Sequence, residues 1–165
     1  MKIKIKLSEL LYFSAFFIWL LFNFIAQTNL VYKYPEIYRF RIVAMIVSII
    51  ILLIKLLLER HSSKFLIFFF SAFCLAIIIG ISTHKLFDAL TIISTILFII
   101  SINNVNFRKV LILWTVSIVL LMISIYGLLK FGIIENTLRV QLGGRFRFSQ
   151  GYQYASFGAN FLFHL

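Results

Sequence analysis

The sequence is poor in helix-breaking residues and in charged residues. It has one proline and seven glycines in 165 residues, and 13% of its residues are charged. Soluble domains carry about one quarter charged residues and are about one half apolar, whereas 62% of this chain is hydrophobic. The composition therefore excludes a water-soluble globule, a collagen and a disordered chain, and it favours a protein whose solvent is lipid.

Cysteine and acidic residues are also scarce. A single cysteine, Cys74, excludes an internal disulfide, and its position in an apolar run predicts a small hydrophobic residue of the core. Five acidic residues stand against 16 Lys and Arg, for a net charge of +11. Because the basic residues are scattered between apolar runs, this excess favours anionic lipid or an anionic, lipid-linked substrate over nucleic acid.

Long apolar runs predict the membrane spans, since a helix needs roughly 20 apolar residues to cross a bilayer. We expect about five complete transmembrane helices, at residues 7–26, 40–58, 65–81, 89–102 and 110–129. The fourth run is short. It fits a span that thins the bilayer, a span completed by neighbouring polar residues, or a re-entrant segment. We favour a short span because re-entry would invert every later loop.

Polar residues inside these runs give more local expectations. We expect Asn23 and the serine and threonine hydroxyls to form hydrogen bonds locally or across helices. Lys55 lies one turn from the end of the second span, and its four-carbon stem is expected to carry the ammonium group to the interface.

Beyond Gly151 the chain turns apolar again and stops at Leu165. Residues 151–165 are too few to cross a bilayer, so they predict a sixth helix cut in mid-span and a chain that is part of a longer polytopic protein. The expected fold class is all-α: a polytopic integral membrane helix bundle, with residues 1–165 forming a single transmembrane domain.

The distribution of Lys and Arg predicts a multi-pass protein of the cell membrane with a cytoplasmic N-terminus. With that orientation the inner segments carry Lys2, Lys4, Lys6, Arg60, Lys64, Arg108 and Lys109. The loop at 130–150 is then external, although it carries Lys130, Arg139, Arg145 and Arg147. A topology signal does not explain four external cations, so this loop is the main candidate for a binding or catalytic site.

Polar and aromatic residues alternate in part of that loop. Arg145, Arg147 and Ser149 alternate with Phe146 and Phe148, so an extended segment would have one cationic face and one apolar face. Guanidinium groups bind phosphate in a forked geometry, and aromatic faces stack on sugars or lie at the membrane interface. Two interpretations stay open: a site for a ligand with a pyrophosphate head, a sugar chain and a lipid tail, or an interfacial loop anchored in lipid headgroups.

The same loop resembles a known family. Gly132-Ile133-Ile134, then Arg139, then Arg147-Phe148-Ser149-Gln150-Gly151-Tyr152-Gln153-Tyr154 is similar to the large outer-loop region of bacterial polysaccharide polymerases. These belong to the O-antigen polymerase and ligase superfamily, which includes capsular and exopolysaccharide enzymes. Many members carry Arg-x-Ser-x-Gly-aromatic before the next helix, and Arg147 with Gly158 matches a spaced Arg and Gly pair of some outer loops.

The resemblance has a departure and a limited extent. Ala155-Ser156 stand where many members have Pro-Asn. Members have more spans than this chain, so the likeness covers at most their first half.

This resemblance implies transfer of a growing glycan from its polyprenyl-pyrophosphate carrier to the next carrier-linked repeat unit, at the outer face of the cytoplasmic membrane. It implies no metal, nucleotide or other cofactor. The implied substrate-binding residues are Arg139, Arg145, Arg147, Ser149, Gly151 and Tyr152, with the arginines holding the pyrophosphate. The implied partners are membrane lipid, polyprenyl-pyrophosphate-linked oligosaccharide and other polysaccharide-assembly membrane proteins, and not nucleic acid.

The catalytic residues stay unknown because the sequence offers no convincing general base, and the sequence leaves open whether this product is an enzyme. We expect the chain alone to be inactive. The alternative function is a small non-enzymatic membrane protein, either a transporter part or an accessory subunit, or an inactive remnant. No three ligands have a spacing typical of a metal site.

Overall fold

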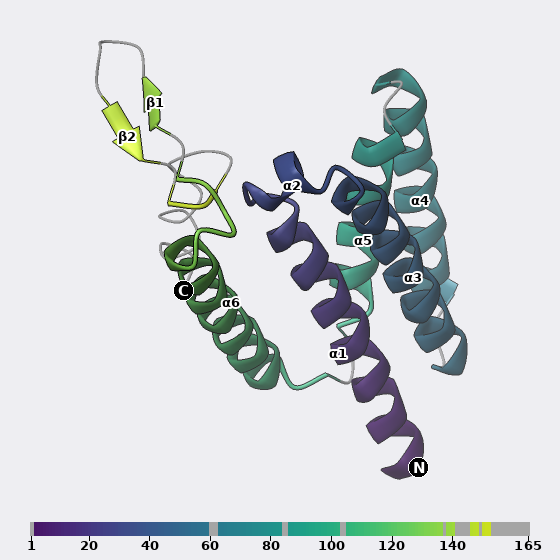
Figure 1. The fold of residues 1–165 in the computed structure, drawn as a ribbon. Coiled ribbons are helices and arrows are strands. Elements are labelled where there is room, and N and C mark those ends of the chain that lie inside the picture. Colours follow the sequence, from purple (N-terminus) through teal and green to yellow (C-terminus); the bar gives the residue numbers. More distant parts are fainter. Residues whose placement is uncertain are drawn as a thin grey trace. The chain divides into compact units, whose positions relative to one another are not determined.

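A computed structural model describes residues 2–59, 63–83, 86–102, 105–136, 138–140, 146–148 and 150–152. Within these ranges it contains six helices followed by one two-stranded hairpin (Figure 1). The elements are α1 (Lys2–Ile25), α2 (Leu30–Lys33), α3 (Ile37–Leu58), α4 (Ser63–Thr83), α5 (Leu86–Ile100), α6 (Phe107–Lys130), β1 (Leu138–Val140) and β2 (Phe146–Phe148). The helical class predicted from the apolar runs is confirmed, and each of the five runs contains a helix.

Three of these helices are long and apolar enough to cross a membrane. The candidate spans are Leu7–Ile25, Ile37–Leu58 and Phe107–Lys130, which correspond to the first, second and fifth predicted spans. α4 and α5 hold shorter apolar stretches among the described residues, Ile67–Ile79 and Ala89–Ile100. The three long apolar helices indicate a membrane protein, and the crossing of α4 and α5 stays a prediction. The predicted half-span at 151–165 lies, apart from its first two residues, outside the described residues.

The connection between the first two spans contains the short helix α2, which the sequence pattern did not predict. Pro35 separates α2 from α3. A residue before proline is driven out of the helical region by the pyrrolidine ring, and Tyr34 accordingly has φ −130° and ψ 79°. α2 therefore ends after one turn, at Lys33, and α3 begins two residues beyond the proline, at Ile37.

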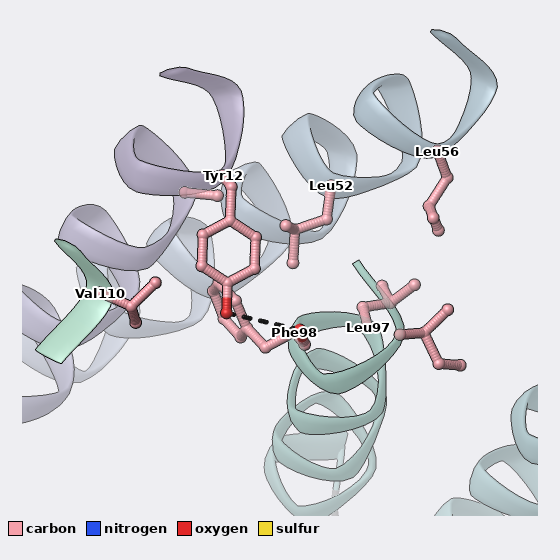
Figure 2. Close-up of a cluster of buried hydrophobic side chains, with 8 residues drawn as sticks. Tyr12, Leu52, Leu56, Leu97, Phe98 and Val110 are labelled. Carbon is pink, nitrogen blue, oxygen red and sulfur yellow. Dashed lines mark hydrogen bonds between the residues drawn. The ribbon is translucent and has the colours of Figure 1, made fainter. Parts of the chain in front are cut away.

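The chain divides into two compact units, and the first consists of residues Met1–Trp19 and Ile42–Val110. Its core is formed by side chains of α1, α3, α5 and α6 (Figure 2): Tyr12, Ala15, Leu52, Leu56, Leu97, Phe98, Ile100 and Val110. The Tyr12 hydroxyl donates a hydrogen bond of 3.5 Å to the carbonyl oxygen of Phe98, and the two rings meet edge to face at 5.8 Å. α4 packs along α5 in the same unit.

Polar groups inside the helices form the local and interhelical hydrogen bonds that were predicted. The Ser48 hydroxyl contacts the carbonyl oxygens of Ala44 at 2.8 Å and Ala15 at 3.0 Å. The indole nitrogen of Trp19 donates to the Ser94 hydroxyl at 3.1 Å. In lipid an unsatisfied polar group costs several kcal/mol, so these bonds remove a penalty as well as joining helices.

The structure corrects one sequence prediction about a single residue and gives the partner of another. Cys74 is exposed on α4 and not part of a core, because a helix in lipid has an apolar exterior and an apolar run therefore does not distinguish core from surface. Lys55 is fully buried, and its ammonium group is paired with Glu59, just beyond the last residue of α3.

The second unit consists of residues Leu20–Arg41 and Leu111–Leu165. Its core contains Phe24, Ile118, Ile125, Ile134 and Tyr152. Phe24 and Tyr152 meet edge to face, with ring centroids 5.8 Å apart and planes at 83°. The segment that follows α6 therefore returns within this unit to the end of α1.

Candidate functional site

The segment that leads from α6 to the hairpin begins with a glycine cap, which sets the direction of the chain at the end of the helix. Gly132 has φ +69°, a left-handed conformation that glycine adopts without steric cost. The Ile133 amide donates to the Leu128 carbonyl at 2.9 Å, and the Gly132 amide donates to the Leu129 carbonyl at 3.1 Å. This pair of bonds is a Schellman motif, which ends the helix and turns Ile134 into the core of the second unit.

The two strands of the hairpin bring two predicted site residues together. β1 and β2 pair in antiparallel fashion (Figure 1), and the register pairs Arg139 with Arg147. The flanking pairs are Leu138 with Phe148 and Val140 with Phe146. The extended segment predicted for this loop is thus present at Phe146–Phe148, and its partner strand places a second arginine at the same register position.

Asn29 holds both ends of the loop that carries the hairpin. Its side-chain amide donates to the Glu135 carbonyl at 2.9 Å, before β1. Its backbone amide donates to the Gly151 carbonyl at 2.7 Å, after β2. The Gln150 amide also donates to the Asn136 side-chain oxygen at 3.0 Å. We call Glu135, Asn136, Gln150 and Gly151 the hairpin neck.

The return side of the neck is a tight turn that requires a glycine. Gln150 and Gly151 both have positive φ, 50° and 84°. A Cβ at Gly151 would lie 2.9 Å from a methyl carbon of Ile125 and 3.4 Å from one of Leu129. Both the backbone conformation and the close approach to α6 therefore exclude a side chain here.

Tyr152 follows the hairpin neck and lies in the core of the second unit. It forms an isolated β-bridge with Thr28, and 4% of its surface is exposed. Burial disfavours the phenolate and raises the pKa of Tyr152 to about 12. Tyr152 therefore stays neutral at ordinary pH, and its ring belongs to the core that supports the hairpin.

The predicted site residues thus separate into three groups. Arg139 and Arg147 are Cα partners in the hairpin, whereas Arg145 and Ser149 lie outside the described residues. Gly151 and Tyr152 form the return side of the neck and its support. Sequence reasoning missed Asn29, because its contact with Glu135 joins residues more than a hundred positions apart and no local pattern signals it.

A second polar cluster, in the first unit, centres on Lys55. Its ammonium group is 2.9 Å from Glu59 Oε1 and donates to the Ser101 carbonyl at 2.6 Å. The Ser8 hydroxyl donates to the same oxygen of Glu59, and the Tyr12 ring lies 6.0 Å from the ammonium. The Lys55 side chain is 0% exposed and that of Glu59 is 9% exposed. Because a charge at membrane depth is stable only with close partners, this cluster fixes the ends of α1, α3 and α5 together.

Neither polar cluster has the composition of a metal centre. Among the residues that the structure describes, no three His, Cys, Asp or Glu side chains gather into a metal-binding group. No protein-family model, no curated protein and no solved structure matches this chain.

Proposed function

We propose that this protein binds polyprenyl-pyrophosphate-linked oligosaccharide through the hairpin that follows α6, as part of polysaccharide assembly. The observation that carries the proposal is the register that pairs Arg139 with Arg147. Like charges directly opposite each other destabilise an antiparallel pair. An anion with several oxygens neutralises both guanidinium groups at once, and pyrophosphate offers them forked acceptors.

The position of the hairpin along the chain supports a lipid-linked ligand. The hairpin neck follows α6, whose candidate span ends at Lys130, and it is held by Asn29, which follows the candidate span ending at Ile25. Both spans thus end a few residues from the neck. A pyrophosphate attached to a polyprenyl chain lies at this depth, where the polar headgroups begin.

The proposed topology has five crossings with a cytoplasmic N-terminus. In the first unit, the bonds from Ser8 to Glu59 and from Lys55 to Ser101 bring together the start of α1 and the ends of α3 and α5. The chain that leaves α3 and passes through α4 and α5 therefore returns to the side of the membrane where α3 ends. It follows that α4 and α5 either both cross the membrane or both stay on that side. α4 has 21 residues, which span about 30 Å, and this length favours two crossings.

A cysteine placed at Lys85 tests this topology. In a Cys74→Ser background, a single Lys85→Cys substitution between α4 and α5 should react with an impermeant maleimide from outside intact cells, and Lys4→Cys should react only after permeabilisation. Protection of Lys85→Cys until permeabilisation would show that α4 and α5 do not cross.

Substitutions of Arg147 test the binding proposal. The probe is a polyprenyl pyrophosphate titrated against the 165-residue chain in nanodiscs. Charge-assisted hydrogen bonds contribute about 1.5–3 kcal/mol each, so Arg147→Ala should weaken binding about ten- to a hundredfold. Arg147→Lys keeps the charge without the fork and should give an intermediate loss. Arg108→Ala, on an exposed residue of the first turn of α6, is the matched control and should leave affinity unchanged.

Two outcomes separate this proposal from its alternatives. Unchanged affinity in both Arg147 variants would leave the hairpin as a headgroup anchor. Expression of the chain in a polymerase-null strain tests the expectation that these 165 residues are inactive alone: polysaccharide ladders would identify an active polymerase and contradict that expectation.

A further inference from the structure

The second unit contains a cleft that the proposed pyrophosphate site does not use. It has a volume of about 340 Å³ and is lined by Asn29, Tyr32 and Lys33 on one side and by the segment from Gly132 to Glu135 on the other. Ligand clefts begin at about 300 Å³, so this volume accommodates one small polar group. We call it the headgroup cleft.

Two opposite charges line the headgroup cleft without neutralising each other. Lys33 and Glu135 are both exposed, and among the described residues the ion pairs are formed by other side chains. The ammonium of Lys33 contacts the Tyr34 ring, 5.8 Å from its centroid. A simple anion is attracted by Lys33 and repelled by Glu135, and a simple cation meets the reverse. A ligand that carries both charges is attracted by both residues.

The exposed tyrosines around the cleft favour a position at the level of the lipid headgroups. Tyr32 is 64% exposed and Tyr34 is 51% exposed, a short distance beyond the candidate spans that end at Ile25 and Lys130. Exposed tyrosines just beyond a span lie at the level of the lipid headgroups. A tyrosine face also attracts an ammonium group, so Tyr32 adds to the cationic half of the site.

We propose that the headgroup cleft binds the zwitterionic headgroup of an aminophospholipid, with the phosphate near Lys33 and the ammonium near Glu135. Binding of this headgroup depends neither on the polysaccharide function nor on which leaflet the cleft faces. A soluble phosphoethanolamine also carries an ammonium and a phosphate, and what favours the lipid is the position of the cleft beside the ends of two spans.

Lipid retention in defined nanodiscs tests the proposal. The full chain is reconstituted in an equimolar mixture of phosphatidylethanolamine and phosphatidylglycerol with the same acyl chains, and co-purifying lipid is counted by native mass spectrometry. We expect phosphatidylethanolamine to be enriched about three- to tenfold, in line with one exposed ion pair and one cation–π contact. Glu135→Gln should abolish the enrichment, and Lys33→Gln should reduce retention of both lipids.

The chain offers matched controls for both substitutions. Glu36 and Lys130 are exposed residues near the same helix ends and do not line the cleft, so Glu36→Gln and Lys130→Gln make the same charge changes and should retain the enrichment. Equal losses in the controls, undiminished enrichment in Glu135→Gln, or undiminished lipid retention in Lys33→Gln would overturn the site. Displacement of the lipid by an equimolar amount of soluble phosphoethanolamine would overturn the assignment to a lipid. Helical circular dichroism of every variant verifies that each has folded.

Discussion

The two units join distant helix ends by different means. In the first unit a buried lysine does so: Lys55 bonds Glu59 and the Ser101 carbonyl, and its side chain is 0% exposed. In the second unit an uncharged residue does so, since Asn29 bonds the carbonyls of Glu135 and Gly151 at 2.9 and 2.7 Å. The first unit thus uses an ion pair for this connection, whereas the second unit uses hydrogen bonds of a neutral side chain and of the backbone.

The first unit also contains an exposed pair that isolates the effect of burial. Lys109 and Glu9 are 2.9 Å apart, the same distance as Lys55 and Glu59, but Lys109 is 56% and Glu9 is 19% exposed. Equal distances do not imply equal energies, because removal of one partner from a buried pair leaves an uncompensated charge. Water and salt screen an exposed pair instead. The comparison therefore predicts a wide spread of mutational effects.

The largest effect is expected from Lys55→Met. This substitution leaves the Glu59 carboxylate buried without its cation, which costs about 3–5 kcal/mol. The measurement is the free energy of unfolding in detergent. Lys55→Met combined with Glu59→Gln removes both charges and should recover most of the loss, because a neutral buried pair has a smaller desolvation penalty. A double variant no more stable than the single one would refute the role assigned to the buried charge.

Asn29→Ala should give the next largest loss. It removes the side-chain donor to the Glu135 carbonyl and keeps the backbone bond to Gly151, so we expect a loss of about 1–3 kcal/mol. Ser124→Ala is a suitable control, since its hydroxyl bonds the Leu120 carbonyl one turn earlier on an exposed face of α6. If the two substitutions have the same effect on unfolding, Asn29 does not hold the neck.

Apart from α2, the helices were predictable from the sequence because each depends on an apolar run, which is a local property. α5 illustrates this: its short apolar run indicated a helix, and the structure has one at Leu86–Ile100. The pattern did not distinguish core from lipid-facing side chains, as Cys74 shows. In lipid both surroundings are apolar, so hydropathy alone carries no such information.

The candidate site was only partly predictable, because it depends on contacts between distant residues. The arginines were visible in the loop sequence, but the pairing of Arg139 with Arg147 required the partner strand. The ion pair of Lys55 does have a local signal in the sequence: Glu59 lies four residues later, on the same helical face, at the spacing that favours an ion pair.

A smaller effect is expected from the phenol under the hairpin neck. The pKa of Tyr152 is about 12 in the folded protein and about 10 in an unfolded chain. The folded state therefore binds more protons between these values, and stability falls as pH rises from about 10 through 12. We expect a loss of up to about 2 kcal/mol, and Tyr152→Phe should lose less across this range. A parallel pH dependence in wild type and Tyr152→Phe would contradict this assignment.

The smallest effect is expected at the exposed pair. Lys109→Ala removes the partner of Glu9, but Lys109 is more than half exposed, and pairs of this kind contribute about 0.2–1 kcal/mol. Because solvent ions screen the pair, even this loss should shrink as salt is raised toward 1 M, where the Debye length is about 3 Å. The same salt series should leave the effect of Lys55→Met nearly constant, since no mobile ions reach a buried pair. Unfolding free energies of both variants across that series measure the difference directly. Equal salt sensitivity at the two sites would mean that the ammonium of Lys55 is accessible to solvent and that the two pairs differ in position only.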